Sequence, residues 1–117
     1  MKERALVEIN FTNKKIAKIC CSAKEMQAKH GKRMAEKIQQ RLAELQAAET
    51  LADMRLIPGA RCHVLTGNFA GQLAVDLVHP DRLIFSPDHD PRPELPAGGL
   101  DWQKVTKILV EGIGDYH

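Results

Sequence analysis

Apolar and polar residues alternate in several short stretches of the chain, which is the pattern of strands with one buried face. Val7, Ile9 and Phe11 alternate with polar neighbours near the beginning, and Leu73 and Val75 do so in the second half. We predict strands over residues 5–11, 61–65, 72–78, 82–85 and 105–113. Because only short turns separate the second, third and fourth of these strands, antiparallel pairing is favoured.

A helical period replaces the alternation in the first half of the chain. Thr12 or Asn13 can cap a first helix that ends near Cys21. A second, longer helix is predicted over residues 23–48. Its apolar stripe recurs every three to four residues: Met34, Ile38, Leu42 and Leu45. Gly31 lies inside this pattern, where it costs about 1 kcal/mol relative to alanine and can mark a break.

The order of the predicted elements indicates an α+β fold. A strand comes first, two helices follow, and the other strands come last. This segregation favours two helices packed on one face of a mostly antiparallel sheet of about four to five strands. The 117 residues fit one domain of ordinary size. Residues 86–101 include four prolines and predict an irregular loop.

Charge is distributed unevenly along the chain. Residues 1–47 hold 11 Lys and Arg against 5 Asp and Glu, whereas residues 48–117 hold 6 against 10. A basic surface can meet phosphates, although solvated side chains on a helix are the commoner explanation of such residues. Aromatic residues make up only 4% of the chain, which disfavours a platform of several base-stacking rings.

The cysteines and the apolar runs exclude other classes of protein. Three cysteines are an odd number and none has the CxxC spacing, which argues against a disulfide framework and against a cysteine zinc site. No apolar run approaches the ~18 residues that a membrane span needs. We therefore expect a cytoplasmic protein without a membrane partner.

Two histidines lie in or beside predicted strands and are candidates for catalysis. His63 lies in the second strand, and His117 follows the last one together with Asp115 and Tyr116. Arg82 begins another strand. Histidine exchanges protons near neutral pH and arginine stabilises charge on a phosphorane, so this set suits cleavage of RNA through its 2′-hydroxyl. Spacing alone leaves open whether these residues meet.

Asp88, His89 and Asp90 have the composition of a metal cluster. They lie in the proline-rich loop, and no second cluster in the sequence completes a coordination set. A solvated loop is the preferred interpretation. We predict no metal site and no cofactor.

The chain resembles the HigB-like host-killing toxins, a branch of the RelE/ParE toxin superfamily. The most specific features are a His-x-Leu-x-Gly turn at residues 63–67 and the Asp-Tyr-His ending at 115–117. The other matching stretches are residues 57–62, 71–72, 75–77 and 82–85, the Lys-Arg-Met-Ala-Glu-Lys run at 32–37, and 51–53. The resemblance thus covers nearly the whole chain.

The resemblance implies the toxin of a type II toxin–antitoxin pair, which enters the ribosomal A site and cuts mRNA there without a metal ion. Its partners would be the ribosome, the mRNA and a small helix-turn-helix antitoxin, with operator DNA reached only through the antitoxin. The family's catalytic positions match His63, Arg82, Asp115, Tyr116 and His117. One histidine would be the base and the other the acid. Arg82 would stabilise phosphate charge, Tyr116 would orient or stack on a base, and Asp115 would orient a histidine.

RNA contacts are expected at five further residues: Lys32, Arg33, Lys37, Arg61 and Thr66. Thr66 is a departure, because the family often has a lysine there, and losing one charge-assisted contact costs about 1.5–3 kcal/mol. Phe69-Ala70 replaces a turn that is often basic, and the loop between Phe85 and Val105 is longer than in compact members.

Two other functions remain open. A toxin of the ParE branch shares the fold but inhibits DNA gyrase by contact, and it does not require Arg82 or the Tyr116-His117 pair. A weakened toxin-fold protein would bind only its antitoxin, and Thr66 with the lost basic turn favours that interpretation.

Overall fold

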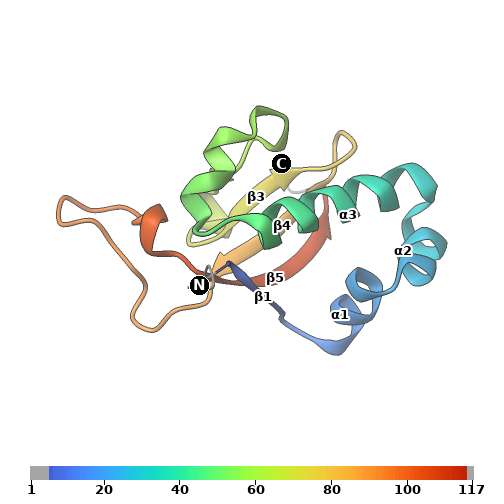
Figure 1. Cartoon of the computed structure of the whole chain (residues 1–117), viewed down its shortest axis with the longest axis horizontal. Helices are drawn as coiled ribbons and strands as arrows, with labels where there is room; N and C mark the ends of the chain where they lie inside the picture. The colour runs from blue at the N-terminus through green and yellow to red at the C-terminus, as the bar shows by residue number, and fades with distance from the viewer. Residues whose placement is uncertain (1–5, 116–117) are drawn as a thin grey trace, which may run out of the picture.

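The computed structural model describes residues 6–115, which form an α+β fold around one five-stranded sheet (Figure 1). The strands are β1 (Glu8–Phe11), β2 (His63–Val64), β3 (Leu73–Asp76), β4 (Arg82–Pro87) and β5 (Lys107–Gly114). The α-helices are α1 (Lys14–Cys21), α2 (Ala23–His30) and α3 (Lys32–Ala47). Short 3-10 helices complete the chain: η1 (Leu51–Leu56), η2 (Pro58–Ala60), η3 (Gly67–Phe69) and η4 (Trp102–Lys104).

Side-chain caps and one glycine set the limits of the α-helices. The Oδ1 atom of Asn13 accepts a hydrogen bond from Ile16 N at 2.9 Å, so Asn13 rather than Thr12 caps α1. Gly31 has φ +83, a left-handed value that favours glycine, and it divides the predicted long helix into α2 and α3. No helix within residues 6–115 is long and apolar enough to cross a membrane.

The sheet has the order β1-β5-β4-β3-β2, and its pairs are antiparallel except for the parallel pair of β1 with β5. The predicted mostly antiparallel sheet is therefore confirmed. The parallel pair is possible because β1 and β5 are separated along the chain by the three helices and by strands β2, β3 and β4, which form a long connection. β2 is shorter than predicted, since Arg61 has left-handed backbone (φ +46) and interrupts the extended stretch.

Alternation along the strands gives the sheet two distinct faces. The core face packs with the apolar side of α3, which crosses the sheet in Figure 1. It carries Leu73, Val75, Leu83, Phe85, Ile108 and Val110. The opposite face of the sheet is called the outer face. His63, Ala74 and Ile84 lie opposite one another on neighbouring strands of this face, which also carries the residues two positions before or after them on each strand. The alternation that predicted the buried side of β3 and β4 is confirmed.

The proline-rich loop is fastened to the sheet by its own side chains. Nε2 of His89 accepts hydrogen bonds from Thr106 N at 3.1 Å and from Lys107 N at 3.3 Å. Nη1 of Arg92 donates to the carbonyl of Gly71 at 2.7 Å. The expectation of a solvated Asp88-His89-Asp90 segment is therefore wrong for His89, whose ring anchors the loop beside β5.

Candidate functional site

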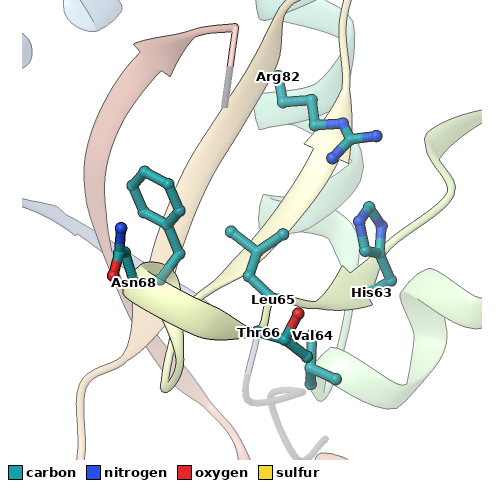
Figure 2. Close-up of a pocket in the computed structure, with 7 residues that line it drawn as sticks. His63, Val64, Leu65, Thr66, Asn68 and Arg82 are labelled. Atoms are coloured by element: carbon teal, nitrogen blue, oxygen red, sulfur yellow. The ribbon is translucent and has the colours of Figure 1, made fainter. Parts of the chain in front are cut away.

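A cleft of about 390 Å³ opens at β2, η3 and the start of β4 (Figure 2). Seven residues line it: His63, Val64, Leu65, Thr66, Asn68, Phe69 and Arg82. Figure 2 shows the Arg82 guanidinium and the His63 ring extending toward each other, with Leu65 beside them. Two of the predicted catalytic residues therefore share one cleft.

The backbone of Arg61 fixes the ring of His63. Nδ1 of His63 lies 2.6 Å from the carbonyl oxygen of Arg61, the residue with left-handed backbone at the end of η2. A carbonyl oxygen can only accept, so Nδ1 carries the hydrogen and the neutral ring keeps its lone pair on Nε2. Nε2 is thus the atom of His63 that can take a proton from a ligand.

Asp76 holds the Arg82 guanidinium from the neighbouring strand. The two residues are opposite each other in the β3–β4 ladder, and Oδ1 of Asp76 lies 3.5 Å from Nε of Arg82. The other carboxylate oxygen lies 3.6 Å from Nε of Arg61. The Arg61 side chain is 72% exposed and that of Arg82 only 18%, so the contact restrains Arg82 more strongly.

Asp76 is a residue of the site that the sequence pattern did not indicate. The feature that could have indicated Asp76 is its position as a charged residue in the alternating stretch 72–78, a few residues before Arg82 in the sequence. Pairing across a hairpin puts such residues on the same face.

The end of β5 lies at the Arg82 end of the sheet. Gly114 is opposite Arg82 in the β4–β5 ladder, and the exposed Asp115 follows it. Tyr116 and His117 lie outside the described residues. Convergence of the last three residues on the cleft therefore stays a prediction.

The five predicted RNA-binding residues fall in different places. Thr66 lines the cleft, and Arg61 lies beside it through its contact with Asp76. Arg33 and Lys37 line a second hollow beside the β3–β4 turn, and Lys32 is exposed at the first residue of α3. The structure therefore does not bring the basic run of α3 into the cleft.

Arg41 is a buried charged residue of α3 that is not one of the residues of the predicted apolar stripe. It is 4% exposed, and its guanidinium bonds three partners. Nε donates to the carbonyl of Asp76 at 2.7 Å, Nη2 to the carbonyl of Gly59 at 2.8 Å, and Nη1 to the carboxylate of Glu44 at 2.9 Å. Arg41 thus ties α3 to the end of β3, beside the carboxylate that holds Arg82.

Two of the three thiols are poor nucleophiles. Burial raises the pKa of Cys62 to about 12. Burial, with a smaller effect of Cys21, raises the pKa of Cys20 to about 11. Because the thiolate is the nucleophilic form, neither side chain is suited to covalent catalysis at neutral pH.

The cleft combines a proton-transfer group with a fixed cation. Nε2 of His63 can act in general acid–base catalysis, and Arg82 can stabilise charge that develops on an anionic oxygen. Comparisons of the chain with family models, with curated proteins and with solved structures gave no match. The function is therefore inferred from the cleft and from the sequence.

Proposed function

We propose that the chain is the toxin of a type II toxin–antitoxin pair, a metal-independent endoribonuclease that cuts ribosome-bound mRNA in the cytoplasm. The observation that carries the proposal is the cleft shared by His63 and Arg82, with Nδ1 of His63 held by the Arg61 carbonyl. A proton-transfer group beside a cation is the central requirement for attack of a ribose 2′-hydroxyl on its own phosphate. The resemblance to HigB-like toxins supplies the ribosome, the mRNA and the antitoxin as partners.

In the proposed reaction the 2′-oxygen bonds to phosphorus while its proton passes to a base. The bond from phosphorus to the 5′-oxygen breaks, and an acid protonates the leaving oxygen. The products are a 2′,3′-cyclic phosphate and a 5′-hydroxyl. His63 takes one proton role through Nε2 and His117 takes the other. Arg82, held by Asp76, neutralises charge on the phosphorane oxygens.

Induction of the untagged chain in bacteria without its antitoxin tests this function. New 5′ ends on a reporter mRNA are mapped for the unaltered chain, Arg82→Ala and His117→Ala, because a C-terminal tag would cover His117. Lys104→Ala is the control, since this side chain is 75% exposed beyond the opposite end of β5. We expect discrete cuts in translated sequence, weakened about 10²–10⁴-fold in the two site variants and unchanged in the control. Cutting by Arg82→Ala at the unaltered rate would contradict the proposal.

A weakened toxin-fold protein that only binds its antitoxin is the second candidate. It is favoured by the Asp76 carboxylate, which offsets the charge of Arg82, and by Thr66, which brings no cation to the cleft. It predicts neither growth arrest nor cuts in the same experiment. Arrest without cuts would instead indicate inhibition by contact, as in the ParE branch.

A further inference from the structure

The proposed proton-transfer chemistry does not use Phe69, which lies in the wall of the same cleft. Phe69 ends η3, is half-buried, and lines the cleft together with His63 and Arg82. The chain has only three Phe, one Trp and one Tyr. Phe85 and Trp102 are buried in the core. Among the described residues, Phe69 is the aromatic residue that lines the cleft.

Hydrogen bonds hold this wall in place on both sides. Phe69 N donates to the carbonyl of Thr66 at 3.3 Å, and Gln72 N donates to the carbonyl of Phe69 at 3.0 Å. The proline-rich loop adds the bond from Arg92 to the carbonyl of Gly71, two residues after Phe69. A wall that is already ordered loses little conformational freedom when a ligand settles on it.

Polar residues line the same cleft as Phe69. Asn68 and Thr66 are exposed and line the same cleft. Figure 2 shows Asn68 at one side of the cleft, with His63 and Arg82 at the other. The Asn68 amide offers donors and an acceptor together, as the edge of a nucleobase requires. The cleft therefore has a stacking and hydrogen-bonding end at η3 and a cationic, proton-transferring end at Arg82.

We propose that the η3 wall is a nucleobase subsite, in which Phe69 stacks on one base of single-stranded RNA and Asn68 hydrogen-bonds to its edge. One nucleotide joins a base to a phosphate through a ribose, so it matches the two ends of the cleft. The cleft volume of about 390 Å³ lies within the range of small-ligand sites, about 300–1,000 Å³. The subsite deepens the proposed function and rests on its RNA substrate.

The subsite also changes the interpretation of the Phe69-Ala70 turn. The resemblance implied a basic turn here, whose loss would weaken RNA binding. An aromatic platform replaces attraction to phosphate by stacking on a base, which every base permits because each has a π-face. Binding at this wall is therefore expected to depend less on salt than binding by a lysine would.

Binding of adenosine 5′-monophosphate and of ribose 5-phosphate to the full chain tests the subsite. Both probes carry the phosphate, and only the first carries a base. Titrations followed by NMR shifts of the cleft residues compare the unaltered chain with Phe69→Leu and Phe69→Trp. Leucine keeps an apolar side chain without a π-face, whereas tryptophan keeps stacking.

We expect the unaltered chain and Phe69→Trp to prefer the nucleotide over ribose 5-phosphate. Phe69→Leu should lose about 5- to 150-fold in affinity for the nucleotide and keep its affinity for ribose 5-phosphate. A ring that only supports the fold would lower stability without changing this preference. Asn68→Ala should reduce the spread of affinities among the four nucleoside monophosphates.

Three results would overturn the subsite. They are equal affinity of the unaltered chain for the two probes, unaltered nucleotide binding by Phe69→Leu, and no shift of cleft residues at millimolar nucleotide. The reporter-mRNA experiment distinguishes failure of the subsite proposal from failure of the proposed function. Cuts together with equal affinity for adenosine 5′-monophosphate and ribose 5-phosphate would keep the nuclease and reject the subsite. A preference for the nucleotide that Phe69→Leu removes, found without cuts, would keep the subsite and reject the nuclease.

Discussion

The two faces of the sheet use the same strands for different purposes. On β4, Leu83 and Phe85 are fully buried against the helices, whereas Arg82 lines the cleft. Ala74 and Ile84 of the outer face are buried too, but they lie outside the main core cluster. Because side chains alternate along a strand, stability and chemistry are assigned to neighbouring residues. Moving a substitution by one position therefore changes which property is lost.

The largest contrast is expected between Leu83→Ala and Arg82→Ala. Deleting the buried Leu83 side chain should lower the free energy of unfolding by about 2–5 kcal/mol. Arg82→Ala removes an ion pair with a partly exposed carboxylate and should cost at most about 1 kcal/mol. Urea denaturation of the two variants measures both effects. Equal losses would show that Arg82 also supports the fold and would break the comparison.

Cys62, which directly precedes β2, extends the contrast, and here the variable is pH. The half-buried Cys62 packs against the core, and burial raises its pKa from 9.0 to about 12. Above pH 9 the unfolded chain releases this proton while the folded chain keeps it. Stability is therefore fully present below pH 9 and falls as pH rises toward 12, by up to about 1.4 kcal/mol per pH unit.

Cys62→Ala removes this titration and leaves the other ionisable groups in place. Denaturation at pH 8, 9 and 10 should show the stability difference between the unaltered chain and the variant narrowing above pH 9. A constant difference across this range would show that the thiol titrates alike in both states.

A small effect is expected from Ser86→Ala, which tests how much polar bonding on the outer face stabilises the fold. Its Oγ donates to Oε2 of Glu111 at 2.9 Å, where a register shift in the β4–β5 ladder leaves Glu111 without an opposite residue. Ser86→Ala should lower the free energy of unfolding by about 1 kcal/mol. Thermal unfolding of Ser86→Ala and Leu83→Ala under the same conditions compares the contributions of the two faces to stability. A loss above about 2 kcal/mol for Ser86→Ala would contradict the assignment of stability to the core face.

Local patterns predicted the fold better than the site. Alternation identified the strands, and the Asn13 cap fixed the start of α1, because both depend on near neighbours in the sequence. The roles of Asp76 and Arg41 could not be predicted in this way. Arg41 bonds carbonyls 18 and 35 residues away, and a charged residue on a helix normally indicates solvent. The prediction that His63 and Arg82 belong to one site depended on the resemblance and not on their spacing in the sequence.

The buried Arg41 also has a consequence for local unfolding. Its guanidinium bonds two carbonyls outside α3, so separation of α3 from the sheet breaks the hydrogen bonds to the Asp76 and Gly59 oxygens. The middle of α3 and the end of β3 are therefore one cooperative unit with a shared opening free energy. Their amide hydrogens should exchange with solvent at closely similar protection, and the Asp76 carboxylate beside Arg82 is displaced whenever that unit opens.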